Sequence, residues 1–257
     1  NGKLWSRFPL AEPMPNPIFE GPIKSLTGLS GAQFDGLLGG THSVTSDGKV
    51  VAGIAGPHRG GHAIEHLLKK IDVPKELEAA KAKLSAASPS KVDECLKRVK
   101  YLHSLSVTGT SASDAYVMKN IAVIPPALRP ASILNDGKNI DYADINELYK
   151  HVGIVNTKLN DPMLRHAPEE QSKLRVDLYK RIAGISGYGI PFADAKHKGL
   201  LHTIAGAQPK GGYFQKRITQ KRQDLSMAAV VIPEPNLGLN EVGFPREAAL
   251  DLFRPFV

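Results

Sequence analysis

The chain has 257 residues, of which 42% are apolar, and its formal net charge is +8. This length and composition are those of a globular protein with one large or two modest domains. The single cysteine, Cys95, excludes an intramolecular disulfide and a Cys-based zinc site, and this favours an intracellular protein. No run of apolar residues approaches 18 in length, which argues against a membrane span.

Residues 1–61 are dense in glycine and proline, which prevents long helices and predicts loops with short strands. The Asp-Gly pair in "TSDGKVVAGI" predicts a turn that enters a strand. In "QFDGLLGG" the lone carboxylate of Asp35 cannot hold a metal in the two-metal manner, and this stretch is predicted to be a turn.

Residues 62–122 change to helical periodicity, with apolar residues at i, i+3 and i+4 from His62 to about Leu105. Two or three helices are expected, with breaks near Pro74 and at "SPS", where Ser88 could cap the next helix. Cys95 falls on the apolar spacing of that helix and is predicted to be buried. "SVTGTSASDAY" is predicted to be a loop.

Residues 123–204 begin at the end of a short strand that stops at Pro125 and Pro126, and an irregular loop follows. Two amphipathic segments separated by "NDPMLRHAP" predict a helical hairpin, whose second helix ends at Gly184 and Gly187. Residues 205–257 are expected to contain a strand at "AAVV", several turns, and a short helix from Pro245 to Phe253. The predicted fold class is α+β.

The most distinctive chemical feature is a basic stretch from Lys196 to Arg222, which has seven Lys or Arg, no Asp or Glu, and Tyr213 and Phe214 interleaved. Such a stretch suits a polyanion, although an ordinary solvated face is the competing interpretation. Gly211 and Gly212 allow close approach of the backbone. Five or six phosphate contacts would give a slope of log affinity against log salt of roughly −4 to −5.

A second chemical candidate is "HAIEH", in which His62, Glu65 and His66 match the H-x-x-E-H pattern of one class of zinc enzymes. The alternative is the polar face of a helix, since no third ligand can be identified. The sequence contains neither a phosphate-binding glycine loop nor a serine-hydrolase elbow, so nucleotide hydrolysis and serine-hydrolase chemistry have no support.

Four stretches in the last 135 residues or so resemble, in the same order, the β′ subunit of multisubunit DNA-directed RNA polymerase. "VIPPALRP" is similar to the V-L-P-P-x-L-R-P string before the lid loop, and "DINELYKHVGIVNTKL" resembles the start of the clamp helices. "KGGYFQKRITQKRQDLSMAAVV" and "GFPREAALDLFRPFV" resemble the segment that leads into the double-psi barrel. "HAIEHLLKKIDVPKELE" is more weakly similar to a β′ stretch, which offers His62 a structural role.

The resemblance implies a lid at Arg129–Asn139, a clamp coiled coil at Asp144–Ile182, a rudder at Gly184–Lys198 and a template-holding switch at Lys210–Arg222. The fold would be a clamp leading into the first strands of an incomplete double-psi β-barrel, divided into 1–61 (loops and strands), 62–122 (helices), 123–204 (lid, hairpin and rudder) and 205–257 (switch and barrel start). The implied nucleic-acid contacts are Arg129, Lys196, Lys198, Lys210, Tyr213, Lys216, Arg217, Lys221 and Arg222, and no catalytic residue is implied.

The chain also departs from the β′ pattern. "SMAA" replaces S-G-R-S, Tyr213 and Gln215 replace arginines, and both the zinc-binding cysteines and the aspartate loop for catalytic Mg²⁺ are absent. A split, zinc-free β′ of this kind resembles those of giant bacteriophages. That resemblance implies an intracellular viral protein acting in a host bacterium, packaged in the virion or not. Its partners would be another β′ fragment, which carries the aspartates and binds Mg²⁺, together with β-like subunits, template DNA and RNA. Whether a σ-like factor also binds is left open. A stand-alone basic nucleic-acid-binding module and a His-based zinc enzyme are the alternatives.

Overall fold

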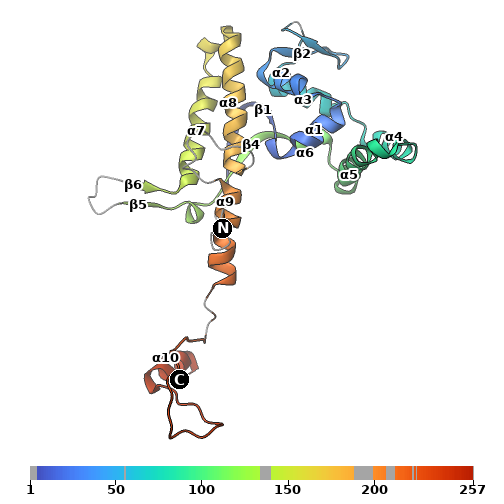
Figure 1. Ribbon diagram of the computed structural model, residues 1–257. Coiled ribbons are helices and arrows are strands. Elements are labelled where there is room, and N and C mark those ends of the chain that lie inside the picture. The colour runs from blue at the N-terminus through green and yellow to red at the C-terminus, as the bar shows by residue number, and fades with distance from the viewer. Residues whose placement is uncertain are drawn as a thin grey trace. The chain divides into compact units, whose positions relative to one another are not determined.

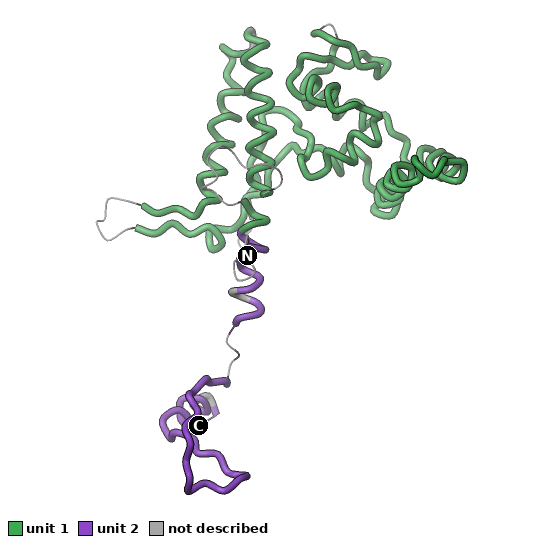
Figure 2. The backbone as a smooth tube through the Cα atoms, in the orientation of Figure 1, with its two compact units in different colours: residues 1–202 green, residues 203–257 purple. Residues whose placement is uncertain are grey.

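In the computed structural model, the described residues form helices and three small antiparallel sheets, which agrees with the predicted α+β class (Figure 1). The structure describes residues 5–54, 56–133, 140–187, 199–206, 212–221, 223 and 225–256. It divides into two compact units, residues 1–202 and 203–257, shown in green and purple in Figure 2. Among the described residues, no helix is both long enough and apolar enough to cross a lipid bilayer.

The elements of the chain have the following bounds. The strands are β1 (Ser6–Pro15), β2 (His42–Val44), β3 (Val50–Ala52), β4 (Val117–Val123), β5 (Ala131–Ile133) and β6 (Ile140–Tyr142). The α-helices are α1 (Glu20–Thr27), α2 (Gly31–Gly39), α3 (Gly60–Lys69), α4 (Val73–Ser85), α5 (Val92–Thr108), α6 (Ala112–Tyr116), α7 (Asp144–Leu159), α8 (Pro168–Ser186), α9 (Leu200–Ala205) and α10 (Arg246–Phe253). The short 3-10 helices are η1 (Pro17–Phe19), η2 (Pro89–Lys91), η3 (Pro126–Leu128), η4 (Pro162–His166) and η6 (Arg254–Phe256), and η5 (Phe214–Thr219) is a π-helix.

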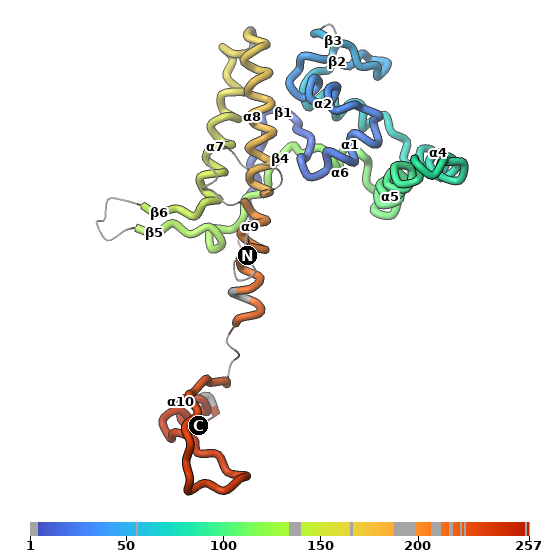
Figure 3. The backbone as a smooth tube through the Cα atoms, viewed as in Figure 1, coloured from blue at the N-terminus to red at the C-terminus, as the bar shows by residue number. Residues whose placement is uncertain are grey.

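The first unit is organised around β1 and β4, which run antiparallel and side by side although more than a hundred residues separate them in the chain (Figure 3). Their pairing is interrupted between Pro9 and Met14 of β1, where residues 10–13 stand opposite Lys119 alone. Such a bulge leaves backbone groups without ladder partners. Three helices approach it: α7 and α8 through polar side chains, and α3 through Gly61, where a Cβ would lie 1.6 Å from the Pro13 carbonyl oxygen.

The prediction of loops and strands for residues 1–61 is wrong in part, because α1 and α2 form there. Glycines end these helices instead of preventing them: Gly28 and Gly40 are C-caps with φ of 71° and 78°. Ser30 and Gln33 form a capping box that starts α2, so Asp35 lies in a helix and not in a turn. The turn at Gly48 is confirmed, since it has φ of 90° and joins β2 to β3.

The helices expected after His62 are confirmed as α3, α4 and α5, and they are interrupted just before Pro74, at residues 70–72, and around residues 88–90, as predicted. Ser88 precedes the 3-10 helix η2 but makes no side-chain capping bond. The predicted loop at 106–116 is wrong, because α5 continues to Thr108 and α6 follows at once, capped by the hydroxyl of Ser111. Cys95 is only partly buried, so the prediction of a buried cysteine is confirmed only in part.

The predicted helical hairpin is confirmed as α7 and α8, which pack antiparallel through buried apolar residues such as Leu148, Val152 and Leu178. Gly187 ends α8 in the left-handed conformation, as expected, whereas Gly184 lies buried inside the helix. Asn156 of α7 and Arg175 of α8 join this hairpin to the β1 bulge. The hairpin is therefore fixed to the N-terminal part of the first unit.

The second unit contains α10, at the position predicted for the last helix. The strand predicted at "AAVV" is not formed: residues 225–245 have no helix or strand, and Val230 and Val231 are 90% and 93% exposed. A β-branched run needs neighbouring strands to supply its hydrogen bonds. None is present among the described residues of this unit.

Candidate nucleic-acid interface

The proline-rich segment after β4 is held in place by Arg129. The guanidinium donates from Nε to the Ile124 carbonyl at 2.9 Å and from an Nη to Asn146 Oδ1 at 3.0 Å. Asn146 donates back to the Arg129 carbonyl at 3.1 Å. Arg129 thus connects the segment containing η3 to the first turn of α7, and its position is set by three hydrogen bonds.

Tyr149, on the next turn of α7, makes a second connection to the same segment. Its hydroxyl donates to the Ala122 carbonyl at 2.9 Å and accepts from the Ile124 amide at 3.3 Å. Burial raises the pKa of this hydroxyl above its usual value, although the Ile124 bond and the Arg129 charge oppose the shift. The phenol therefore stays protonated at neutral pH and keeps donating.

The segment predicted as the lid begins as a β-hairpin. Ala131 pairs with Tyr142, Ser132 with Asp141, and Ile133 with Ile140. Because side chains alternate along a strand, Ala131, Ile133, Ile140 and Tyr142 share one face. Ile133, Ile140 and Tyr142 are 71%, 48% and 47% exposed. Residues 134–139, the rest of the predicted lid, lie outside the described residues.

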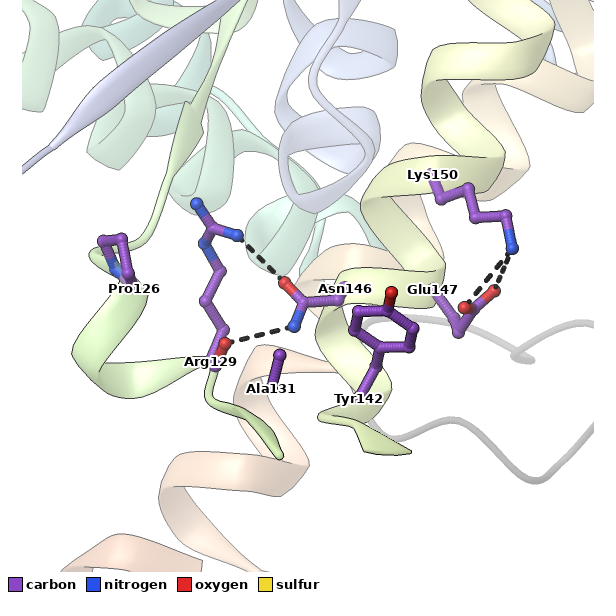
Figure 4. A pocket seen from close by; sticks show the side chains of 7 residues that line it. All are labelled: Pro126, Arg129, Ala131, Tyr142, Asn146, Glu147 and Lys150. Carbon is purple, nitrogen blue, oxygen red and sulfur yellow. Dashed lines mark hydrogen bonds and ion pairs between the residues drawn. The ribbon is translucent and has the colours of Figure 1, made fainter. Parts of the chain in front are cut away.

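An open pocket of about 510 Å³ lies where this hairpin meets α7 (Figure 4). Its lining is Pro126, Arg129, Ala131, Tyr142, Asn146, Glu147 and Lys150. Lys150 Nζ lies 3.2 Å from a Glu147 oxygen, in an ion pair whose lysine side chain is 62% exposed. The pocket thus combines an aromatic ring and apolar walls with one partly buried cation, one exposed cation and one carboxylate.

Of the nine residues predicted to contact nucleic acid, Arg129 is partly buried at this pocket, in the first unit. Tyr213, Lys216, Arg217 and Lys221 belong to the second unit. Tyr213 is partly buried beside η5, Lys216 and Arg217 lie within η5, and Lys221 is exposed after it. Lys196, Lys198, Lys210 and Arg222 lie outside the described residues, as does most of the predicted rudder.

The histidines of "HAIEH" do not form a metal site in the structure. The His66 ring stacks on that of His58 with centroids 4.1 Å apart, while His62 is largely exposed. The Glu65 carboxylate is already paired with Lys69 at 2.8 Å and Lys119 at 3.3 Å. No group of three His, Cys, Asp or Glu in the described part of the chain could hold a metal ion. The geometry therefore gives the zinc interpretation no support.

Electrostatics in this helix follow from those contacts. Burial raises the pKa of Glu65, but the ion pairs with Lys69 and Lys119 outweigh this effect and hold the pKa below its usual value. Burial, together with the charges of His58 and Lys70, lowers the pKa of His66, and a hydrogen bond with the Ser46 backbone opposes the shift only in part. His66 Nε2 is buried with no hydrogen-bond partner among the described residues, so His66 favours the neutral form.

Sequence reasoning missed the pocket residues Tyr142, Asn146, Glu147 and Lys150. The i, i+4 spacing of Asn146 and Lys150 places them on one helix face. Tyr142 reaches the same place only because β6 pairs with β5. The alternation of apolar residues at 131, 133, 140 and 142 was the available signal for an exposed hairpin face.

Comparison with known proteins identifies relatives among RNA polymerase subunits, although no family model matches the chain. It is 32% identical over 202 residues to DNA-directed RNA polymerase subunit gamma of Synechococcus sp. (strain JA-2-3B'a(2-13)). It is 33% identical over 209 residues to subunit beta' of Streptococcus suis (strain 05ZYH33), and 30% identical over 203 residues to subunit beta' of Ralstonia nicotianae.

Each match covers 77% of this chain, but only 32%, 16% and 14% of the respective relative. The chain therefore spans about a third or less of the length of the relatives it matches. Over most of its own length it is homologous to β′ and γ subunits of DNA-directed RNA polymerase, in agreement with the resemblance seen in the sequence motifs.

Proposed function

We propose, from this homology to β′ and γ subunits, that the chain is the N-terminal β′ part of a DNA-directed RNA polymerase and that it holds template DNA and the RNA–DNA hybrid during transcription. The observation that carries the proposal is one continuous stretch, residues 123–187. In it the proline-rich segment, the β5–β6 hairpin and the α7–α8 hairpin follow in the order that the resemblance to lid and clamp coiled coil requires.

The basic stretch of the second unit would supply the grip on the template. Lys221 is exposed, and Lys216 and Arg217 lie on the short π-helix before it. Cations that contact phosphates add affinity without base preference. In this proposal the exposed Val230 and Val231 pair with barrel strands that lie outside these 257 residues.

The chemical step of such an enzyme is nucleotidyl transfer, for which two Mg²⁺ ions stabilise the attacking and leaving oxygens. The aspartate loop for those ions is not within these 257 residues, so in this proposal it lies elsewhere in the polymerase, and we assign no zinc to these residues. The remaining partners in the proposal are β-like subunits, template DNA and the transcript, with a σ-like factor as a candidate partner. An origin in a giant bacteriophage, with action inside the host cell, is part of the proposal and rests on the sequence departures alone.

Co-purification tests the proposal directly. Expressed in its native setting with an affinity tag, the chain should be recovered in fixed stoichiometry with β-like chains and with a chain that carries an aspartate loop. Recovery of the tagged chain with nucleic acid but without those proteins would favour the alternative of a stand-alone basic module, which the basic stretch alone would also explain.

A double variant tests the template grip. Changing Lys221 and Arg222 to Ala should weaken DNA binding similarly for different sequences and should make the salt slope shallower by about 2, because each phosphate contact contributes about 0.9. A change in sequence preference with an unchanged slope would contradict a phosphate-gripping role.

A further inference from the structure

The pocket at the base of the β5–β6 hairpin continues an exposed apolar surface. Ala131 and Tyr142 form the cross-strand pair closest to α7, and they line the pocket. The next pair on the same face, Ile133 and Ile140, is exposed. A planar apolar group lying along this face would reach the Tyr142 ring.

The polar groups of the pocket differ in how firmly they are held. Arg129 and Asn146 are bound to each other and to the backbone of the proline-rich segment, so they shape the wall. Among the residues that the structure describes, Lys150 is held only by its i, i+3 pair with Glu147, and its side chain is 62% exposed. Exposed pairs of this kind contribute little free energy. The ammonium can therefore exchange its carboxylate for a ligand phosphate, which frees the Glu147 oxygens to accept a hydrogen bond.

We propose that this pocket binds one nucleotide of single-stranded RNA, with the base stacked on Tyr142, the phosphate at Lys150 and the ribose 2′-hydroxyl donating to Glu147. The inference rests on the proposed function, and it adds a specific ligand site to it. Stacking on an aromatic ring together with a nearby cation is how single strands are bound without sequence preference. The 2′-hydroxyl is the group that distinguishes RNA from DNA.

The pocket dimensions and charge agree with this ligand. A volume of about 510 Å³ is within the usual range for small-molecule sites. Two cations and one carboxylate line the pocket, so an anionic ligand is favoured over a cationic one. An apolar peptide would leave Lys150 and Glu147 facing apolar atoms, which is unfavourable.

The test uses the full chain and a short fluorescent single-stranded RNA, with anisotropy as the readout. Tyr142→Ala should weaken binding by about 5- to 150-fold, the range measured for loss of one stacked base. Tyr142→Phe keeps the ring and should bind like the unaltered chain. Lys150→Ala should reduce the salt slope by about 0.7, the value for one contact on a single strand. Lys158→Ala, which removes an exposed lysine from the end of the same helix, is the matched control.

Two further measurements locate the ligand and identify its sugar. RNA carrying 4-thiouridine should cross-link to the tryptic peptide 139–150, which contains Tyr142 and Glu147. DNA of the same sequence should bind more weakly than RNA, and Glu147→Ala should remove that difference. Circular dichroism confirms that each variant is folded.

Unchanged affinity in folded Tyr142→Ala, or cross-links confined to other peptides, would overturn the site and leave the pocket to a protein segment or to no partner. Equal affinity for RNA and DNA would overturn the assignment to RNA. These outcomes do not depend on co-purification with polymerase subunits. Failure of the site and failure of the proposed function can therefore be distinguished.

Discussion

Asn156 is the side chain whose removal should weaken the first unit most specifically. It lies on α7, is 9% exposed, and fills the interruption in the β1–β4 pairing. Its Oδ1 accepts from the Ala11 amide at 2.7 Å, and its Nδ2 donates to the Pro9 carbonyl at 3.2 Å. One amide side chain thus replaces the ladder bonds that the bulge removes, and it fixes the helical hairpin to β1.

Asn156→Ala should destabilise the first unit by about 2 to 4 kcal/mol. A buried donor or acceptor left without its partner costs about 1 to 3 kcal/mol. In this variant two groups, the Ala11 amide and the Pro9 carbonyl, would lose their partner. Both are only partly buried, which places the sum in the lower half of the range. For a unit of this size, the midpoint of thermal unfolding should fall by about 4 to 16 °C.

The measurement is urea and thermal unfolding followed by circular dichroism at 222 nm, where the α7–α8 hairpin contributes strongly. Asn160→Ala is the matched control, because Asn160 ends the same helix, is exposed, and uses only its backbone in the hydrogen bonds of the helix end. A loss of less than about 0.5 kcal/mol in Asn156→Ala, or an equal loss in both variants, would refute the bridging role.

Three other predictions follow from single contacts. Gly61→Ala should lower the free energy of unfolding by about 3 kcal/mol or more, because its Cβ would lie 1.6 Å from the Pro13 carbonyl oxygen. Gly21→Ala has no atom within 4 Å of its Cβ and should stabilise α1 by about 0.5 to 1 kcal/mol. The midpoints of urea unfolding compare the two variants. Arg129→Ala should increase amide hydrogen exchange in residues 123–131 and reduce stability by about 1 to 2 kcal/mol, and unchanged exchange would contradict its anchoring role. Folding lowers the pKa of His66 from 6.5, so the unfolded state binds more protons than the folded state below that pH. The free energy of unfolding should therefore be at its full value above pH 6.5 and should fall as the pH decreases. His66→Phe should flatten this pH dependence, measured by urea titrations between pH 7.5 and 5.5.

The sequence determined the elements whose signals are local. Apolar spacing defined α3, α5, α7 and α8, the Asp-Gly pair defined the turn between β2 and β3, and Gly187 defined the end of α8. The motif order also indicated the polymerase family, which the relatives support. Local reasoning failed for α1 and α2, because glycine and proline disfavour the interior of a helix yet are well suited to its ends. The sequence alone could not distinguish Gly28 and Gly40 as caps from glycines in a loop.

The tertiary structure alone decided how distant parts of the chain meet. Pairing of β1 with β4, the bulge at residues 10–13 and its hydrogen bonds to Asn156 depend on residues more than a hundred positions apart, for which periodicity carries no information. The same holds for the pocket, where Tyr142 reaches α7 through the register of a hairpin. It also holds for the run at Val230: a local pattern can state that a strand is favourable, but a strand forms only where another supplies its hydrogen bonds.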